Sequence, residues 1–373
     1  MKQFSFPTAP DPAFLFGCGR FRMEEHLLER CSEEVLKFGC HPLLVCDDNS
    51  AAIAASTIDA SLKAEGVELR ELRHNGFCCR DDALAYAESG ALEGIDVVLG
   101  CGGGVILDFS KCLAHLAGAP VVTMPTSSAT CCAYTPIAVC YTREGRYVST
   151  SHFRHEVASA LLDTTILSRQ PPRLLAAGAL DALAKKIEIE FWSKLPAAGN
   201  ASGEAASRIA EVVSDFIYND LDRKIDAAIA DLARGEPTPT LRDVFFDAIV
   251  GAGVVSGISG GSRQTAIAHR FYFFAKQSHP EKMASRTHGE LVAVGLVMQL
   301  AYNGHMAEAE AFAARLRGWG LPASMSDLGL PFDDAEADAC TAFIEKTKTM
   351  KAAIPVDASA IPRLRESMKV IFK

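Results

Sequence analysis

The stretch that decides the fold is residues 96–142, D-V-V-L-G-C-G-G-G-V-I-L-D-F-S-K-C-L-A-H-L-A-G-A-P-V-V-T-M-P-T-S-S-A-T-C-C-A-Y-T-P-I-A-V-C-Y-T. An apolar run ends in a glycine cluster at 100–104, a helical pattern carrying Asp108 and Lys111 follows, and a second apolar run covers Ala119–Met124. This order of strand, glycine turn, helix and strand places free backbone N–H groups where a phosphate can bind. The spacing matches neither G-x-G-x-x-G nor the P-loop, so a tight turn without a ligand stays an alternative to nucleotide binding.

Short apolar runs alternate with helical patterns through the first 160 residues, and this alternation predicts a parallel sheet with crossover helices. A helix is expected over Ile53–Glu65, and a β-hairpin is expected over Ile137–Tyr141 and Tyr147–Thr150, with its turn at Glu144-Gly145. The strands expected in the sheet are Pro42–Cys46, Val67–Arg73, Ile95–Leu99 and Val121–Met124.

Beyond this region strand-like runs disappear and helical periodicity takes over. The segment Arg173–Trp192, for example, carries apolar residues at spacings of three and four. The further helices expected are Ala201–Tyr218, Leu221–Leu232, Leu241–Val255, Gln264–Ala275 and Glu290–Tyr302, with helices continuing through 307–373. We therefore expect an α/β domain over residues 1–160 and an all-α domain over residues 161–373.

Composition excludes several classes of function. The chain has 373 residues and a formal net charge of −9, with basic residues scattered, which argues against binding to nucleic acid or to a membrane surface. The first ten residues lack the apolar core of a signal peptide, and no apolar stretch approaches the ~20 residues of a transmembrane helix, so a cytoplasmic protein is expected. Twelve cysteines without a C-x-x-C motif are expected to be small buried hydrophobes, with Cys131 as the exception.

Asp47 directly follows the first clear strand. In a nucleotide-binding sheet a carboxylate at this place accepts hydrogen bonds from the adenosine ribose and repels a 2′-phosphate, which favours NAD(H) over NADP(H). The alternative is a helix N-cap, because D-D-N-S is also a good capping sequence and that interpretation alone explains the residues.

Three residues in the helical half are candidate metal ligands: Asp181, His269 and His288. Two imidazoles and a carboxylate suit Zn²⁺ or Fe²⁺ and leave a coordination position for substrate. Each residue also has a simpler interpretation. Asp181 could pair with Lys185 four residues later, His269 could be a core histidine that donates to a backbone carbonyl, and His288 could belong to a helix start.

Five stretches, taken in order, resemble the metal-dependent alcohol dehydrogenases of the iron-containing and glycerol dehydrogenase type. They are G-G-G-V-I-L-D-F-S-K, P-T-S-S-A-T, T-P-I-A-V-C-Y-T-R-E-G, L-L-A-A-G-A-L-D-A-L-A-K and H-G-E-L-V-A-V-G, and they run from Gly102 to Gly295. The resemblance implies an N-terminal Rossmann-like α/β domain and an all-α C-terminal domain, the dehydroquinate synthase-like or glycerol dehydrogenase-like fold, with the active site in the cleft between them.

The same resemblance implies a role for individual residues. Asp181, His269 and His288 would bind the catalytic divalent metal, Zn²⁺ or Fe²⁺, and Asp47 would contact the adenosine ribose. The residues implied at the pyrophosphate are Gly103, Gly104 and Asp108. Those implied along the nicotinamide half of the cofactor are Thr126, Ser127, Thr135, Ile137 and Tyr141.

The chain departs from the glycerol dehydrogenases at the substrate. They carry Asp at the place of Cys131, whereas this loop reads A-T-C-C-A-Y-T-P and is similar to the hydroxycarboxylate dehydrogenase branch, with Cys131 and Tyr134 at the substrate. A neutral thiol does not repel a carboxylate as Asp does, so glycerol is not favoured. A second histidine that often follows the first ligand is replaced by Tyr272, which could substitute for it, and His279 competes with His269 as a ligand.

The function expected is a metal-dependent oxidoreductase that transfers a hydride between NAD(P)(H) and a small 2-oxo or 2-hydroxy acid, or a related alcohol or carbonyl compound. Arg263 or Arg270 could neutralise the acid, but we expect both to be solvated charges on a helix face. The alternatives are polyol oxidation of the glycerol dehydrogenase type, a lyase or cyclase like dehydroquinate synthase, and a nucleotide binder without chemistry. The only partner expected is a small-molecule substrate, and the resemblance implies a homo-oligomer.

Overall fold

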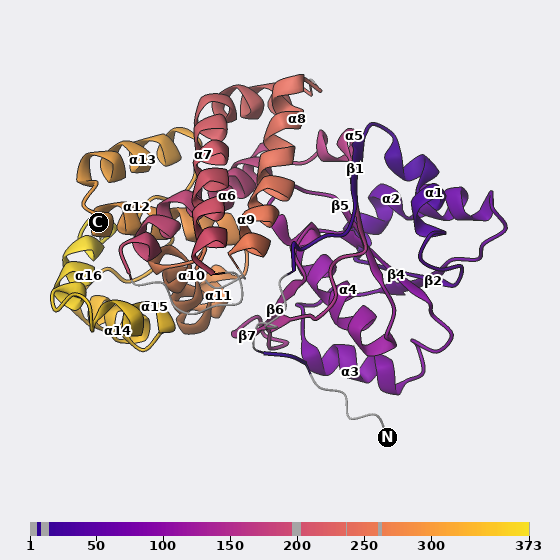
Figure 1. Cartoon of the computed structure of the whole chain (residues 1–373), viewed down its shortest axis with the longest axis horizontal. Coiled ribbons are helices and arrows are strands. Elements are labelled where there is room, and N and C mark those ends of the chain that lie inside the picture. Colours follow the sequence, from indigo (N-terminus) through magenta and orange to yellow (C-terminus); the bar gives the residue numbers. More distant parts are fainter. Residues whose placement is uncertain (1–5, 9–14, 196–202, 236, 260–262, 373) are drawn as a thin grey trace.

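A parallel sheet and a bundle of helices lie side by side in the molecule (Figure 1). The structure is a computed structural model, and it describes residues 6–8, 15–195, 203–235, 237–259 and 263–372. The N-terminal half is an α/β domain, and everything after the last strand of the sheet is helical. The fold class expected from the sequence is therefore confirmed, while the domain boundary at residue 160 stays a prediction.

Six parallel strands form the sheet, with all neighbouring pairs in parallel register. In spatial order they are β1 (Phe21–Glu24), β8 (Ser159–Asp163), β5 (Val121–Pro125), β4 (Val97–Gly102), β2 (Pro42–Cys46) and β3 (Arg70–Arg73). The chain leaves β2 toward β3 on one side and returns to β4 on the other, so the order reverses between β2 and β4. In sheets of this kind ligands bind at the carboxyl ends of the strands where the order reverses.

Helices cover both faces of the sheet because alternate strand residues belong to two separate hydrophobic clusters. Leu44 and Leu99 pack with the helix α2 (Asp48–Lys63), whereas Leu43 and Val98 pack with the helix α4 (Gly104–Ala117). The side helices α1 (Ser32–Val35), α3 (Arg80–Glu88) and α5 (Thr164–Leu167) complete this half. The expected hairpin forms as β6 (Ile137–Tyr141) and β7 (Tyr147–His152).

Two strands were missing from the sequence prediction. β1 is a four-residue edge strand with two charged residues, so its hydrophobic pattern is weak. β8 is fully buried between β1 and β5, and the expected domain boundary at residue 160 cuts through it. The prediction of Val67–Arg73 as one strand was too long, because only Arg70–Arg73 pairs with β2.

The helical half contains ten helices of the described residues besides the short α11 (Pro280–Met283). They are α6 (Pro172–Ser193), α7 (Gly203–Arg234), α8 (Pro239–Phe246), α9 (Ala252–Ile258), α10 (Ile267–Ser278), α12 (His288–Asn303), α13 (Met306–Gly318), α14 (Asp334–Glu345), α15 (Lys348–Ala353) and α16 (Ala360–Met368).

One helix prediction in this half was wrong. The segments expected as separate helices at 201–218 and 221–232, of which residues 201 and 202 lie outside the described residues, form one helix, α7; Asp220 at the expected break pairs with Lys224 one turn later. The single helix expected over Leu241–Val255 is confirmed as continuous helical structure, in which a π-helical turn at Asp247–Gly251 joins α8 to α9.

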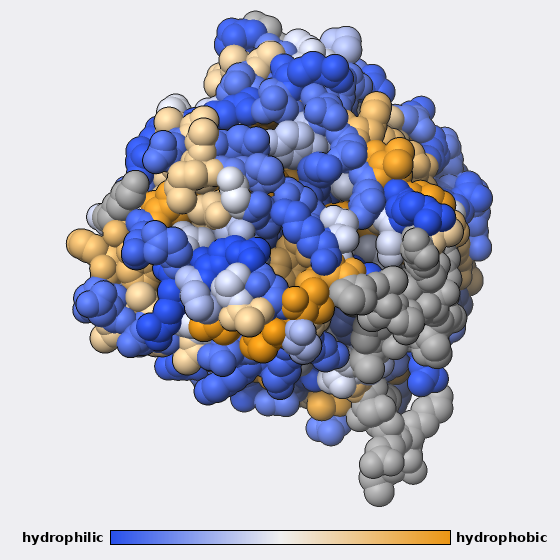
Figure 2. All heavy atoms as spheres, turned by 60° about the vertical axis from the view of Figure 1, so that its left-hand side comes forward, coloured by the Kyte–Doolittle hydropathy of each residue, from blue (hydrophilic) through white to orange (hydrophobic). Residues whose placement is uncertain are grey.

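No helix of the described residues is long and apolar enough to cross a membrane. The face formed by the helical half is mostly hydrophilic, with apolar side chains in small separate patches (Figure 2). The helices α6, α10 and α12 lie inside this half, and each carries one of the candidate metal ligands.

Candidate active site

Three helices bring the candidate ligands together. Asp181 lies in the middle of α6, His269 lies in the first turn of α10, and His288 is the first residue of α12. Asp181 Oδ1 is 3.3 Å from Nε2 of His269 and 3.3 Å from Nε2 of His288, and the two Nε2 atoms are 3.3 Å apart. The three ligand atoms therefore form an equilateral triangle.

This triangle fits a divalent cation. Bonds of ~2.0–2.1 Å in a tetrahedral site place neighbouring ligand atoms about 3.3–3.4 Å apart, which is the spacing seen here. Asp181 Oδ1 is buried and no hydrogen-bond donor is aligned with it, although it is a charged oxygen. The side chain of His288 is 22 % exposed while the other two are nearly buried, so the triangle is open on the side of His288.

The protonation states also suit a cation. Burial acts to raise the pKa of the Asp181 carboxyl, but Lys185 and the two histidines outweigh this effect and hold that pKa well below its ordinary value. Burial lowers the pKa of His288, which keeps its imidazole neutral. An anionic carboxylate and a neutral imidazole are the forms that ligate metal.

Glu188 is a candidate site residue that the sequence analysis missed. Its carboxylate accepts a hydrogen bond from Nδ1 of His269 and another, 3.0 Å long, from the His269 backbone N–H. Glu188 and Asp181 raise the pKa of His269 against the effect of burial. Because Nδ1–H is directed at Glu188, a metal would replace the proton on Nε2, the atom that faces Asp181 and His288. The available signal was the spacing of Asp181, Lys185 and Glu188, which places three charged residues along one side of α6.

The structure confirms some of the simpler interpretations of these residues and contradicts others. Lys185 Nζ lies 3.9 Å from Asp181 Oδ1, so the expected ion pair forms, but it is buried and stands beside the two histidines. The prediction that His269 donates to a backbone carbonyl was wrong, because its Nδ1 bonds to a carboxylate. His279 does not compete for the ligand role, since it pairs with Glu336 at 2.6 Å.

The other candidate region lies where the strand order reverses. Asp47 follows β2 and Gly103 follows β4, and these two strands are neighbours, so both residues stand at the same edge of the sheet. A Cβ added to Gly103 would meet only Ser127 Oγ, at 4.0 Å, so the space beside this backbone is open. No side chain caps the N-terminus of α4, and its free N–H groups face an environment that an anion can enter.

Asp47 is the N-cap of α2, as its alternative interpretation predicted. Its Oδ1 accepts hydrogen bonds of 2.6 Å from the backbone N–H and from Oγ of Ser50, which completes a capping box. No hydrogen bond from a described residue reaches the second carboxylate oxygen, so capping leaves Oδ2 of Asp47 available.

The other residues implied at the cofactor lie around this edge. Asp108 is buried, with one oxygen 2.9 Å from Lys111 Nζ and the other accepting from the Val139 N–H at 2.9 Å, so contact with a pyrophosphate would have to replace these bonds. Thr126 donates its N–H to Gly102 O at 3.1 Å. The remaining members of this set are Gly104 at the start of α4, Ser127 and Thr135 in the loop after β5, and Ile137 in β6.

Two tyrosines join the sheet edge to the histidines. The hydroxyl groups of Tyr141 in β6 and Tyr272 in α10 are hydrogen-bonded, and Tyr272 is buried while Tyr141 is partly buried. The Tyr272 ring packs edge-on against the His288 ring, with 4.3 Å between their centres. Tyr141, implied at the nicotinamide, is therefore connected through Tyr272 to a candidate metal ligand.

The loop after β5 places the Cys131 thiol near the same charges. Burial raises the pKa of Cys131 to about 11, while Lys185 acts to lower it and Asp181 acts to raise it. The thiol is thus neutral near pH 7 and within electrostatic reach of Asp181 and Lys185. Tyr134 packs against Gly253 and the Phe21 ring, so the structure gives it packing contacts, and its role at the substrate stays a prediction.

The expectation that Arg270 is a solvated charge was wrong. Its guanidinium lies 5.3 Å from the centre of the Phe273 ring, donates to Thr265 Oγ1 at 3.0 Å, and has a buried Nε without a partner. Burial lowers the pKa of Arg270. Arg263 is also not simply solvated, since it donates to the Trp192 carbonyl at 3.1 Å and lies over that ring.

Comparisons with known proteins identify relatives of one enzyme family. A family model described as "Iron-containing alcohol dehydrogenase" matches residues 18–164. An uncharacterized oxidoreductase of Synechocystis sp. is 30 % identical over 319 residues, which cover 81 % of this chain and 77 % of that protein. Hydroxycarboxylate dehydrogenase A of Escherichia coli is 28 % identical over 272 residues, covering 72 % and 73 %. It is one relative among several, and others are glycerol dehydrogenases.

The fold is shared with a solved structure. Glycerol dehydrogenase from Schizosaccharomyces pombe aligns with a TM-score of 0.83 at 21 % identity, over 99 % of this chain and 92 % of that one. The α/β sheet domain followed by a helical domain is therefore a known architecture.

The substitution Glu188→Gln is expected to weaken Zn²⁺ binding about 10–100-fold, because the anchor that orients His269 and makes it more basic loses its charge. Affinity would be measured by competition with a fluorescent zinc chelator. Glu190→Gln is the matched control, since Glu190 lies on the same helix but pairs with Lys194 and His305. Equal affinities in all three proteins would show that Glu188 does not support a metal ligand.

Proposed function

Because the chain belongs to the iron-containing alcohol dehydrogenase and glycerol dehydrogenase family, we propose that it transfers a hydride between NAD(H) and a small 2-oxo or 2-hydroxy acid. Members of this family are NAD(P)-dependent oxidoreductases that act on a CH–OH group. The proposal adds the substrate class, the preference for NAD(H), and a divalent metal, Zn²⁺ or Fe²⁺, held by Asp181, His269 and His288.

One observation carries the acid substrate, namely that the Cys131 thiol is neutral and interacts electrostatically with the buried Lys185 ammonium. Burial acts to lower the pKa of Lys185, but Asp181 outweighs it, so the amine stays charged. Lys185 Nζ has no hydrogen bond to a described residue, and its single ion-pair distance is 3.9 Å. A carboxylate of the substrate would be a close anionic partner for this ammonium. An Asp at residue 131 would be such a partner too, but this chain has Cys131.

The charges at the site support the same substrate class. Asp181 and Glu188 each contribute one negative charge and Lys185 one positive charge. With a divalent metal the site would carry one net positive charge, which attracts an anion in a poorly solvated environment. An aspartate in place of Cys131 would cancel that charge, and a neutral polyol would then be accepted more readily.

Each group of site residues would have its own role in hydride transfer. A divalent metal bound at this triangle would polarise the carbonyl oxygen of the substrate as a Lewis acid. The open N-terminus of α4 at Gly103 would hold the pyrophosphate, and the enclosed Tyr141 and Tyr272 would form a wall that positions the nicotinamide and excludes water. Cys131 and Lys185 would orient the acid against that wall.

Polyol oxidation is the second candidate function, because several relatives are glycerol dehydrogenases.

Self-association of the chain is also proposed. The helix α7 exposes Ile209, Val212 and Phe216, at spacings of three and four, with exposed fractions of 52–69 %. A second copy of the chain would cover this stripe, since a side-by-side arrangement of apolar residues on a surface favours association.

The proposed activity predicts a substrate profile. With Zn²⁺ or Fe²⁺ loaded, the protein should oxidise NADH with a 2-oxo acid faster than with simple aldehydes or dihydroxyacetone, and a chelator should abolish turnover. Absorbance of NADH and NADPH would be followed against a panel of these compounds, with Asp181→Asn as the inactive control. Turnover with dihydroxyacetone alone would assign the polyol activity, and no turnover with any compound would contradict both.

Cys131→Asp tests the substrate class. It places a negative charge beside Lys185, so KM for the 2-oxo acid should rise about 10–100-fold. Cys131→Ser is the matched control, because it changes the side chain without adding charge and should keep KM within a few-fold. If the aspartate variant keeps the parent KM, Cys131 does not lie at the substrate carboxylate.

The substitution Asp47→Asn tests whether Asp47 sets the nucleotide preference or only caps α2. Asparagine caps a helix as well as aspartate does, so the fold should be unaffected, while the loss of charge should move the ratio of kcat/KM for NADH over NADPH about 10-fold toward NADPH. Asp333→Asn is the control, because Asp333 caps α14 with the same backbone angles. An unchanged ratio in Asp47→Asn would show that Asp47 is only a cap.

A further inference from the structure

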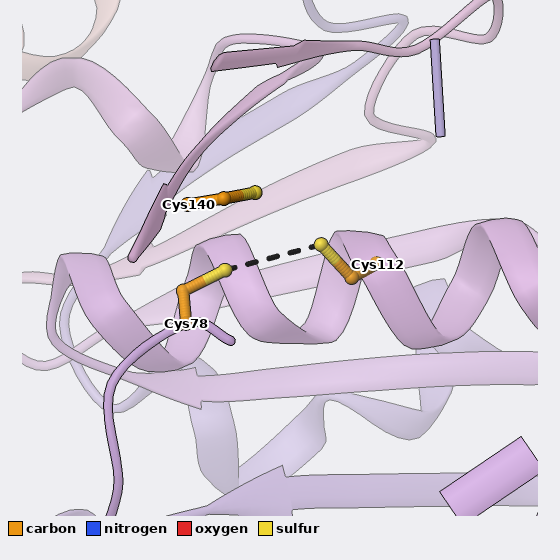
Figure 3. A group of neighbouring side chains, drawn as sticks. All are labelled: Cys78, Cys112 and Cys140. Carbon is orange, nitrogen blue, oxygen red and sulfur yellow. Dashed lines mark hydrogen bonds between the residues drawn. The ribbon is translucent and has the colours of Figure 1, made fainter. Parts of the chain in front are cut away.

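A second group of side chains that could ligate a metal lies in the α/β half, on elements other than the three helices of the candidate active site. Cys78 lies in the loop before α3, Cys112 lies in α4 and Cys140 lies in β6, and their side chains converge on one point (Figure 3). The three sulfur atoms lie within 4.8 Å of one another, and those of Cys78 and Cys112 are 3.9 Å apart. All three residues are buried.

The spacing suits one ion between the three sulfurs. Metal–thiolate bonds are ~2.3 Å long, so three sulfurs around one ion lie about 4 Å apart. Cysteines that merely fill a hydrophobic core have no reason to bring their sulfur atoms to one point, and most of the other buried cysteines of this chain stand outside such a group. The convergence of three separate elements is therefore the feature that needs an explanation.

The donor set selects the kind of ion. Among the described residues no histidine or carboxylate joins the three sulfurs at that distance. Zinc in structural sites takes four ligands, whereas Ca²⁺ and Mg²⁺ take oxygen, so a set of three thiolates fits neither preference. Three-coordinate thiolate binding is typical of soft monovalent ions such as Cu(I).

The surroundings compensate negative charge on the sulfurs. Cys140 Sγ lies 3.5 Å from Ser151 Oγ, and the Arg80 guanidinium donates to the same oxygen at 2.7 and 3.2 Å. Hydrogen bonds from the Cys112 and Cys78 thiols lower the pKa of Cys140, and Ser151 and Arg80 act in the same direction against burial. The neighbouring sulfurs and burial raise the pKa values of Cys78 and Cys112, so these two thiols give up their protons only when the ion binds.

We propose that Cys78, Cys112 and Cys140 form a binding site for one soft, thiophilic monovalent cation of the Cu(I) class, separate from the Asp181 triangle. Binding replaces the thiol protons, which are released to solvent, and no electron is transferred. The ion would tie β6 to α4 and to the loop before α3, directly beside Tyr141, so its role would be to hold the wall expected at the nicotinamide.

The test is competition for Cu(I). Reduced, zinc-loaded protein would be mixed anaerobically with Cu(I) held by a coloured chelator such as bicinchoninate, and the loss of the complex's absorbance would be measured. The parent should remove one equivalent more than Cys112→Ser, and its thermal midpoint should rise on binding. Cys340→Ser is the control, because it removes a buried thiol in α14 that belongs to no such group, and it should match the parent.

Equal uptake by the parent and by Cys112→Ser would overturn the proposal. Because the site is buried, the measurement would be repeated with protein refolded in the presence of Cu(I), and equal uptake there would exclude a failure of access. Cys78→Ser and Cys140→Ala provide second variants if Cys112→Ser does not fold. Metal content at the Asp181 triangle is unaffected by any of these outcomes, so the proposed function is tested separately.

Discussion

Close contact between backbones at three glycines is the constraint on which the candidate active site depends. A Cβ on Gly178 of α6 would lie 1.7 Å from Ser128 O, one on Gly289 of α12 would lie 2.0 Å from Ala177 O, and one on Gly295 would lie 2.5 Å from Ala268 O. Backbone atoms cannot move aside as a flexible side chain does, so only glycine permits these approaches. Asp181 lies three residues after Gly178, His269 directly follows Ala268, and His288 directly precedes Gly289. Because each candidate ligand lies this close to a backbone contact, the three ligand atoms meet.

The same close packing explains why charged residues can stay buried in α6. Removing an ion from water costs several kcal/mol, and a buried ion pair is favourable only when its remaining hydrogen-bonding capacity is used. Glu188 has the N–H groups of His269 and Ala266 as well as the imidazole, whereas Lys185 has, among the described residues, only Asp181 at 3.9 Å. Lys185 interacts electrostatically with Cys131, and its incomplete partner set is the reason for proposing that an anion binds there.

The sequence predicts those parts of the fold that local patterns encode. The glycine turn after β4, the capping motif at Asp47 and the hairpin at β6 and β7 depend on residues close together in the chain, and the structure has all three. Glu188 was missed because its meaning depends on His269, eighty-one positions away in the chain. The metal triangle itself followed only from the family resemblance, since spacing alone left a simpler interpretation open for each ligand.

The cofactor edge and the metal triangle are coupled through tertiary contacts that no local pattern reveals. Lys111 on α4 donates to Ile137 O and pairs with Asp108, which accepts from Val139, so β6 is fixed to the helix that begins at the glycine turn. Tyr141 at the end of β6 is hydrogen-bonded to Tyr272 on α10, three residues after His269. Static contacts therefore connect α4, which begins at the glycine turn, with α10, which carries the candidate metal ligand His269. Hydride transfer requires the nicotinamide and the substrate carbon to be held close together, and this chain of contacts would set that distance.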